Sequence, residues 1–220
     1  MSPDLSRRVL AEGLGAALLA ACVIGSGIMA ERLSGGDRAV ALLANTIATV
    51  AGLASLISLF GPVSGAHFNP VVSWIAFANR QIDARSALAY TVAQIAGCCA
   101  GALLANVMFE LPLLQVSTHV RTGGAQWLSE VVATAGLVLM IFRATTINEA
   151  AWRVPLWIGA AYWFTASTSF ANPAITMGRA LSDTFAGIRP GDAPGFMIAQ
   201  VGGGILGMML LRLFAPRSRH

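Results

Sequence analysis

The 220-residue sequence contains no lysine and little charge of either sign. Charged residues make up 11% of the chain, whereas 56% of its residues are hydrophobic and the mean hydropathy is +0.69. A water-soluble domain carries about 25% charged residues. The composition therefore excludes an ordinary soluble domain and predicts a protein that lies in a lipid bilayer.

The sequence also lacks the motifs of a membrane enzyme. It contains neither H-E-x-x-H nor G-x-S-x-G, and its histidines, His67, His119 and His220, are scattered along the chain. A hydrolase or metalloenzyme needs a nucleophile beside a base, or several metal ligands that converge. We therefore expect no enzymatic activity and no cofactor.

Only three cysteines are present, Cys22, Cys98 and Cys99, and all lie within apolar runs. Their odd number and their placement argue against a disulfide framework. Cys98 and Cys99 are neighbours, so on one helix their side chains would point about 100° apart. Small apolar packing residues are the expected role, rather than metal ligands, which would have to converge.

Long runs without Asp, Glu, Lys or Arg predict transmembrane helices. These runs are residues 39–79, 86–109 and 154–178. A spanning helix needs about 20 apolar residues, so each run is long enough to cross a bilayer. Three further candidates are residues 13–30, residues 193–211 and residues 126–146, the last of which carries Glu130 and Arg143. The sequence predicts six spans.

The distribution of arginine predicts the orientation. The first span follows Arg7 and Arg8, as a signal peptide would, but nothing downstream reads as a soluble mature domain, so we expect a retained helix. With both termini inside, the inner arginines are Arg7, Arg8, Arg80, Arg85, Arg143, Arg153, Arg212, Arg217 and Arg219. The outer ones are Arg32, Arg38, Arg121, Arg179 and Arg189. This bias favours cytoplasmic termini, and the absence of a clustered basic tract argues against a nucleic-acid partner.

The two halves of the chain repeat one pattern: an acidic residue, an Asn-Pro pair, and a Gln followed at +3 and +7 by Gly. The members are Glu12, Asn69-Pro70-Val71, Gln94, Gly97 and Gly101 in the first half and Glu130, Asn172-Pro173-Ala174, Gln200, Gly203 and Gly207 in the second. Three spans in each half place the second half upside down in the membrane, as an inverted-topology repeat. We expect one channel domain over residues 1–220, with repeats at about 5–110 and 124–214.

The glycines of this pattern suggest close helix packing. Gly-x-x-x-Gly lets two helix backbones approach, and we expect this to happen where the two halves meet. Gly202–Gly207 also matches G-x-G-x-x-G. No strand precedes it, so it indicates packing rather than a nucleotide site.

Each Asn-Pro pair predicts the start of a short helix, because Asn is a favoured N-cap and Pro a favoured first helical residue. Residues 69–79 would span about 16 Å, which is half of a hydrocarbon core about 30 Å thick. The alternative is an ordinary loop turn, the commonest meaning of Asn-Pro. Two copies at equal positions in a repeat, both in apolar surroundings, favour two half-helices that enter from opposite faces.

Two such half-helices would meet N-terminus to N-terminus at the middle of the membrane. Their positive dipole ends would converge there, and the Asn69 and Asn172 amides would donate hydrogen bonds into the lumen. Residues 63–68 and 165–171 would remain extended and offer carbonyl acceptors along the same path. This arrangement repels cations and holds neutral, oxygen-bearing solutes.

These motifs resemble the aquaporins and glycerol facilitators, the major intrinsic protein family. Residues 64–71, including Gly65, Ala66 and His67, look like the family's first pore loop, except that Val71 replaces the usual alanine. Residues 172–174 look like the second, and Glu12 and Glu130 resemble its buried, loop-supporting glutamates. The resemblance implies an all-α membrane protein with six transmembrane helices and two re-entrant half-helices, one pore per protomer and a homotetramer.

The positions of the family's outer constriction differ from those of a water-selective pore. By spacing, they fall on Thr49, on Ala160 or its neighbour Ala161, on Ser169, and on Ile175, which replaces a nearly invariant arginine. The resemblance thus implies an opening that is wider and uncharged, and that passes solutes larger than water.

Arg179 lies four residues beyond Ile175, so both share one face of a half-helix. Two roles remain open at this point. Arg179 either lines the outer vestibule as a displaced filter cation or pairs with Asp183, which lies four residues further on.

Residues 172–190 are similar to the small bacterial aquaglyceroporin-like proteins encoded in arsenic-resistance operons. This similarity implies passive conduction of arsenous acid, glycerol-like polyols and water across a bacterial inner membrane. Two alternatives remain: a water-selective aquaporin, and an ion-coupled transporter, which would use Glu12 or Glu130 as a coupling acid. His67, beside the pore, either packs or gates by protonation.

Overall fold

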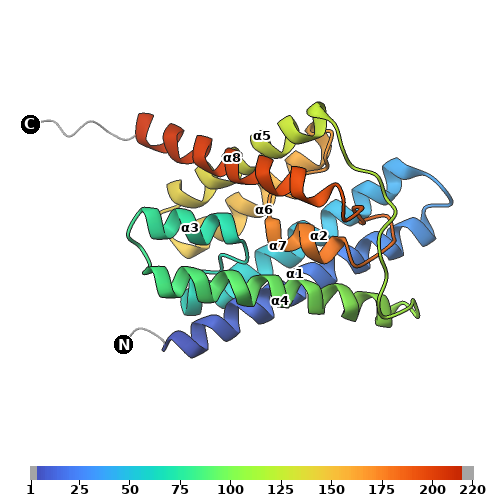
Figure 1. Ribbon diagram of the computed structural model, residues 1–220, viewed down its shortest axis with the longest axis horizontal. Helices are drawn as coiled ribbons and strands as arrows, with labels where there is room; N and C mark the ends of the chain where they lie inside the picture. Colours follow the sequence, from blue (N-terminus) through green and yellow to red (C-terminus); the bar gives the residue numbers. More distant parts are fainter. Residues whose placement is uncertain (1–3, 215–220) are drawn as a thin grey trace, which may run out of the picture.

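The computed structural model describes residues 4–214, so Arg217, Arg219 and His220 lie outside the described part of the chain. This part is helical and contains no strand (Figure 1). Its helices are α1 (Leu5–Leu33), α2 (Arg38–Ser64), α3 (Pro70–Ala78), α4 (Ala84–Met108), α5 (Gly124–Arg143), α6 (Ile147–Phe164), α7 (Pro173–Arg179) and α8 (Ala193–Leu213). Each half of the chain thus contains two long helices, one short helix and one more long helix.

Five of these helices, α1, α2, α4, α5 and α8, are long and apolar enough to cross a membrane. The sixth long helix, α6, has 18 residues and carries Glu149 and Arg153 in its first two turns, where the two side chains pair with each other. With α6, the six long helices correspond to the six predicted spans. The two short helices, α3 with nine residues and α7 with seven, can cross only part of a bilayer.

Side-chain caps begin several of the helices. The Asp37 carboxylate accepts hydrogen bonds from two main-chain N–H groups of α2, and the side chains of Asp83 and Thr146 each accept one from α4 and α6. Such caps satisfy donors that a helix cannot satisfy within itself. At its other end, α2 stops at Gly65, whose φ of 93° lies in the left-handed region and turns the chain back toward the centre of the molecule.

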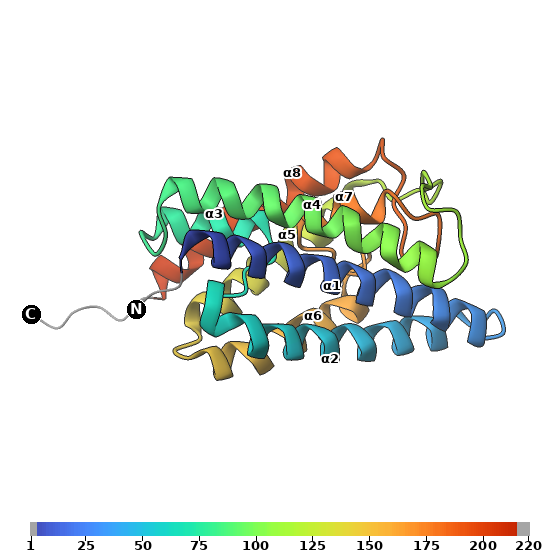
Figure 2. The ribbon, with the colours of Figure 1, turned by 90° about the horizontal axis from the view of Figure 1, so that it is seen from below.

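The long helices form a bundle with two distinct ends (Figures 1 and 2). We call the end where α1 begins and α8 ends the proximal end, and the opposite one the distal end. Helix α3 lies toward the proximal end and α7 toward the distal end, so the two short helices leave the centre in opposite directions (Figure 1). Within each half, α1 packs on α4 and α5 packs on α8, while α2 packs on α6 across the two halves.

The repeated glycines permit close packing within each half. A Cβ atom on Gly97 would overlap the carbonyl oxygen of Gly13, and one on Gly101 would overlap that of Ala17, so α4 presses on α1. Gly203 and Gly207 allow α8 the same approach to α5. The expectation that these glycines lie where the halves meet is therefore wrong, because each pair contacts a helix of its own half.

Two other glycines lie where the halves do meet. Gly178 of α7 packs against the main chain of Cys98 in α4, and Gly204 of α8 packs against the side chain of Val71 in α3. Each short helix thus rests on the last long helix of the other half. The glycines of the G-x-G-x-x-G match, Gly202–Gly207, lie inside α8, where Gly203, Gly204 and Gly207 serve packing.

Candidate functional site

The two Asn-Pro pairs begin α3 and α7 and bring the helix N-termini together at the centre of the molecule. The Asn69 side-chain oxygen accepts a hydrogen bond from Val71 N at 3.0 Å, and that of Asn172 accepts one from Ala174 N at 2.9 Å. Pro70 and Pro173 occupy the first helical positions. Both pairs are helix starts in this structure, and the alternative of an ordinary loop turn is not what they form.

The two asparagine amides also hold the two loops together. Asn69 Nδ2 donates to the carbonyl oxygen of Ala171 at 2.8 Å, and Asn172 Nδ2 donates to that of Phe68 at 2.8 Å. An amide NH2 group carries two hydrogens, so one donor on each asparagine remains for a solute. Both residues line the same cavity.

The loops that precede α3 and α7 have an unusual backbone conformation at equivalent positions. Ala66 and Phe68 have φ values of 51° and 49°, and Ser169 and Ala171 have 49° and 51°. A residue other than glycine whose backbone lies in the left-handed region costs about 1 kcal/mol or more. Something outside each loop must therefore hold it in place.

A buried glutamate holds each loop. Glu12 accepts hydrogen bonds from the main-chain nitrogens of His67 at 2.9 Å and Phe68 at 2.7 Å. Glu130 accepts them from Phe170 at 2.9 Å and Ala171 at 2.8 Å. Both carboxylates are 0% exposed. This arrangement supports the predicted loop-supporting role.

The repeated glutamines complete the two networks. Gln94 Nε2 donates to Glu12 at 2.8 Å and to the Ser73 hydroxyl on α3 at 2.9 Å. Gln200 Nε2 donates to Glu130 at 2.7 Å and to the Thr176 hydroxyl at 2.9 Å. Ser73 and Thr176 each lie four residues after the motif asparagine. The same hydrogen-bond network therefore fixes the short helix in each half.

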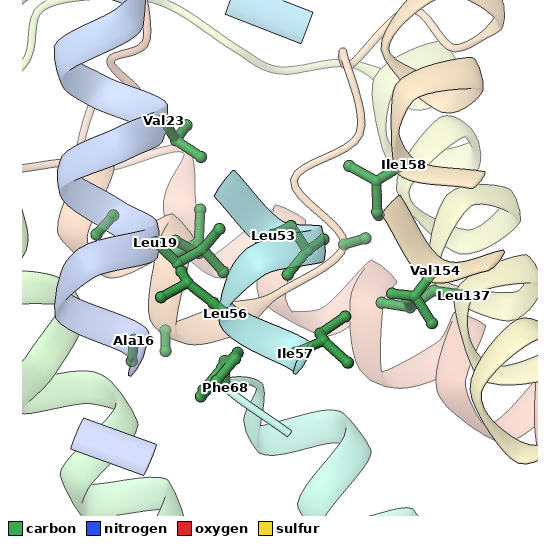
Figure 3. Close-up of a cluster of buried hydrophobic side chains, with 14 of the residues drawn as sticks. Ala16, Leu19, Val23, Leu53, Leu56, Ile57, Phe68, Leu137, Val154 and Ile158 are labelled. Atoms are coloured by element: carbon green, nitrogen blue, oxygen red, sulfur yellow. The ribbon is translucent and has the colours of Figure 1, made fainter. Parts of the chain in front are cut away.

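A narrow cavity of about 90 Å³ runs between the halves past the two asparagines. Its walls are mostly apolar, and Figure 3 shows side chains of α1, α2, α5 and α6 that face this space. Labelled members of this wall are Leu19, Val23, Leu53, Ile57, Leu137, Val154 and Ile158. The polar lining residues are Thr49, His67, Asn69, Tyr162, Ser169, Asn172 and Arg179, and Gly65, Ala66 and Ile175 also line the cavity.

The structure corrects one predicted constriction residue. Ala160 is exposed on the outer side of α6, in a groove with Trp152 and Trp157, and Ala161 does not line the cavity either. The lining residues of α6 are Ala150, Val154, Ile158 and Tyr162, which recur every four residues and therefore share one helix face. That spacing was available in the sequence and would have identified the face.

Tyr162 is the residue that the sequence reasoning missed. Its hydroxyl lies 3.5 Å from Thr49 Oγ1, and both residues line the cavity. Arg179 also lines the cavity. The expectation of an uncharged opening made of Thr, Ala, Ser and Ile is thus wrong in two respects, since a phenol and a guanidinium belong to it.

Arg179 lies over the ring of Phe170, with its guanidinium carbon 3.3 Å from the ring centroid. Its Nε donates to the carbonyl oxygen of Ala186, and the residue is 3% exposed. Asp183 accepts hydrogen bonds from Thr118 instead, at 2.7 Å from N and 3.0 Å from Oγ1. Arg179 and Asp183 form no ion pair in residues 4–214, so of the two predicted roles the structure retains the cavity-lining one.

His67 lines the cavity. Its Nδ1 lies 3.1 Å from the Ser73 hydroxyl, and its ring packs edge-on against Tyr90 with 5.5 Å between centroids. The histidine is thereby fixed by packing and a hydrogen bond, and a gating role stays a prediction.

The cysteines pack against helix backbones. Cys98 Sγ lies 3.6 Å from the carbonyl oxygen of Ala16, and Cys22 Sγ lies 3.3 Å from that of Ala48. Both contacts join neighbouring helices, α4 to α1 and α1 to α2. In residues 4–214, no group of three or more His, Cys, Asp or Glu residues is arranged to hold a metal ion.

Two half-helices that meet at a polar centre, inside a bundle of membrane-spanning helices, define a membrane channel rather than an enzyme. The sequence model of the Major intrinsic protein family matches residues 1–168. The aquaglyceroporin AqpS of Rhizobium meliloti is 54% identical over 218 residues, which cover 98% of this chain and 93% of that protein. The chain therefore belongs to the major intrinsic protein family.

Other relatives agree. The aquaporin TIP1-2 of Zea mays is 30% identical over 151 residues, which cover 66% of this chain and 59% of that one. Among solved structures, the aquaglyceroporin of Plasmodium falciparum is 20% identical, has a TM-score of 0.72 and covers 96% of both chains, which shows a shared fold. The family match ends at residue 168, before the second Asn-Pro pair, which begins at Asn172.

Proposed function

We propose that this channel passively conducts arsenous acid, glycerol-like polyols and water. The observation that carries the proposal is the composition of the cavity. Apolar walls line most of it, and the hydrogen-bonding groups are neutral except at Arg179. A ligand pathway of this kind suits solutes that are neutral and rich in oxygen.

The loop carbonyls strengthen this proposal. The carbonyl oxygens of Gly65, Ala66 and His67 accept no hydrogen bond from any residue between 4 and 214, and these residues line the cavity. Together with the free amide hydrogens of Asn69 and Asn172, they offer acceptors and donors in sequence. Arsenous acid is a neutral triol at neutral pH, so its hydroxyls match both kinds of group without a charge.

The relatives favour the same class of solute. The Rhizobium meliloti relative is named an aquaglyceroporin, and this chain covers nearly all of it. The resemblance of residues 172–190 to proteins of arsenic-resistance operons adds the metalloid. We propose Asn69, Pro70, Val71, Asn172, Pro173 and Ala174 as the pore motif, with Thr49, Tyr162, Ser169, Ile175 and Arg179 at the constriction.

The protein is a multi-pass membrane protein with a bacterial relative. We place the proximal end in the cytoplasm, since Arg7, Arg8, Arg80, Arg85 and Arg143 lie there, and positive residues favour that side. A homotetramer with one pore per protomer is the assembly proposed, by family resemblance.

Osmotic re-swelling of proteoliposomes tests the solute. Vesicles are challenged with glycerol and with arsenous acid, and shrinkage in an impermeant osmolyte gives the water rate. We expect rapid entry of both solutes. In Ile175→Arg, which narrows the constriction, solute entry should fall while water flux persists, and Ala160→Leu, on the outer face of α6, should leave both unchanged. Fast water flux without solute entry would instead identify a water-selective pore.

An ion-coupled transporter is the second candidate, because inverted repeats with broken helices are also built into transporters. In this structure, the four glutamate oxygens are occupied by loop N–H groups and glutamine amides. A carboxylate that shuttles protons must release such partners, so the networks favour the channel. Accumulation of glycerol against its gradient under an imposed pH difference would support the transporter.

A further inference from the structure

The buried Arg179 and the partly buried Arg121 share one aromatic ring at the distal end. The guanidinium carbon of Arg179 lies 3.3 Å from the centroid of Phe170, and that of Arg121, from the segment between α4 and α5, lies 5.1 Å from it. Neither guanidinium forms an ion pair with a carboxylate between residues 4 and 214. Buried charges without a counter-charge are costly, so this pair is an unusual feature.

The two arginines differ in how many of their donors are used. Arg121 donates to three carbonyl oxygens, those of Gly187 at 2.7 Å, Phe185 at 3.3 Å and Ser167 at 3.4 Å. Arg179 donates through Nε to the carbonyl oxygen of Ala186, and its two terminal nitrogens have no hydrogen-bond partner in the described chain. Arg121 therefore holds the loop, while Arg179 presents free donors to the cavity that it lines.

The carboxylates of this region are committed elsewhere. Asp183 accepts from Thr118, and Asp192 pairs with Arg189 at 2.8 Å and accepts from the main-chain nitrogen of Arg121. Glu130 is occupied by the second pore loop. Burial lowers the pKa of Arg121 to about 10, which still leaves it charged at neutral pH.

Ser169 supplies a second, independent observation. It lines the same cavity and immediately precedes Phe170 in the chain. The residue is 2% exposed, and its hydroxyl has no hydrogen-bond partner in residues 4–214. A buried hydroxyl without a partner is rare in native proteins and calls for an explanation, such as a ligand.

We propose that the distal mouth of the cavity binds a small, singly charged oxyanion through Arg179 and Ser169. The two terminal nitrogens of a guanidinium match two oxygens of one ligand, and the serine hydroxyl can donate to an oxygen as well. Arg121 acts as a positioning residue that holds residues 185–187 and adds a second positive charge.

Thermal unfolding of the purified protein tests this site, with nitrate as the probe and gluconate as the replacement at constant ionic strength. We expect a saturable rise in unfolding temperature in nitrate, of about 3 °C at ten times the dissociation constant. Chloride, a single atom that cannot offer two oxygens to the two terminal nitrogens of the guanidinium, should raise it less. Arg179→Gln should abolish the rise, Ser169→Ala should weaken nitrate affinity several-fold, and Arg38→Gln, an exposed arginine at the same end, should change nothing.

The wild-type protein alone can overturn the proposal, if nitrate and gluconate give the same unfolding temperature at all concentrations. An equal nitrate response in wild type and Arg179→Gln would also overturn it and indicate a general salt effect. Should Arg179→Gln fail to fold, Arg179→Lys keeps the charge without the fork, and a retained preference for nitrate over chloride would then count against the site. No transport is measured, so the result is independent of the proposed channel substrate.

Discussion

The two pore loops have the same hydrogen-bond network but different side chains around it. In both, a glutamate, two loop N–H groups, a glutamine and a hydroxyl of the short helix form one network. In the first half, the ring of Phe68 lies over Gly15 of α1, whereas the equivalent positions in the second half are Ala171 and Ala133. The backbone geometry is thus repeated, but the side chains differ: a large residue faces a glycine in the first half, and two alanines occupy the same positions in the second.

The charges differ as well. The first loop has His67 at the position where the second has Phe170, and only the second has arginines, Arg121 and Arg179, against that ring. The repeat therefore fixes the polar centre, which both halves share, and leaves each mouth free to diverge. The cavity lining thus has an imidazole in the first loop and a guanidinium beside the second.

Replacement of the buried glutamates should have the largest effect. Glu130→Gln puts an amide NH2 group where one oxygen now accepts from main-chain N–H groups, and two charged hydrogen bonds are worth about 3 kcal/mol together. We expect a marked loss of folded protein in Glu130→Gln and in Glu12→Gln, measured by thermal unfolding, with flux per folded channel retained. Normal folding with loss of proton-coupled accumulation would contradict the structural role and favour the transporter.

Gly97→Ala should be the next most severe change. The added methyl group would overlap the main-chain carbonyl of Gly13, which cannot move aside without a shift of α1, and overpacking of this kind costs about 2 kcal/mol. Gly202→Ala in α8 is the matched control, since nothing lies within 4 Å of its Cβ position. Unfolding titrations of both variants measure the difference. Equal stability would mean that α1 and α4 do not pack as described.

Much of this fold could be predicted from the sequence because its main constraints are local or repeated. The Asn-Pro pairs carry their own helix-start chemistry, and the absence of charge marks the spans. The order Glu, Asn-Pro, Gln predicted the inverted repeat, and in the structure those same residues form one network in each half. Such features can be recognised in the sequence without knowledge of the tertiary contacts.

What could not be predicted depended on contacts between distant segments. The Gly-x-x-x-Gly pattern does not say which helix it faces, so the assignment to the boundary between halves was wrong. Ala160 was placed by spacing from a family pattern, whereas the lining face of α6 is set by the packing of Val154 and Ile158. The sequence indicates Arg121 only as an outer charge, because nothing in it places this residue beside Phe170, 49 residues away.

The contact of Val71 with Gly204 tests whether a larger side chain in one half is accommodated by a glycine in the other. A Cβ on Gly204 would overlap the Val71 side chain, so the glycine makes room for the valine that replaces the usual alanine. We expect Gly204→Ala to destabilise the protein by about 1–2 kcal/mol and Val71→Ala to leave a void of similar cost. The double variant should recover most of the loss. Additive losses in a double-mutant cycle would show that the two residues do not share one space.

The charge of Arg179 should limit proton leak through the cavity more than the first pore loop does. With Ile175 in place of an arginine, Arg179 is the one cation among the described lining residues, and a positive charge raises the barrier to proton passage. We expect Arg179→Gln to increase proton leak by several-fold, seen as acidification of dye-loaded vesicles under a pH step. Arg38→Gln is the control. No increase over wild type would assign the proton barrier to Asn69, Asn172 and the helix dipoles alone.

The variant with the smallest expected effect tests whether Tyr162 takes part in conduction. Tyr162→Phe removes a hydroxyl that lies 3.5 Å from Thr49 Oγ1, a distance at which the hydrogen bond between them is weak. Because the aromatic ring remains, the width of the cavity should not change, and only one donor for a solute hydroxyl is lost. We expect a fall of about twofold in glycerol flux, equivalent to about 0.4 kcal/mol, with water flux unchanged. Thr49→Val, which removes the partner hydroxyl on α2, should give a similar fall, and the double variant should show less than the product of the two. If both rates of Tyr162→Phe match wild type, the solute passes without contact to this wall, and the polar path consists of the loop carbonyls and the two asparagines.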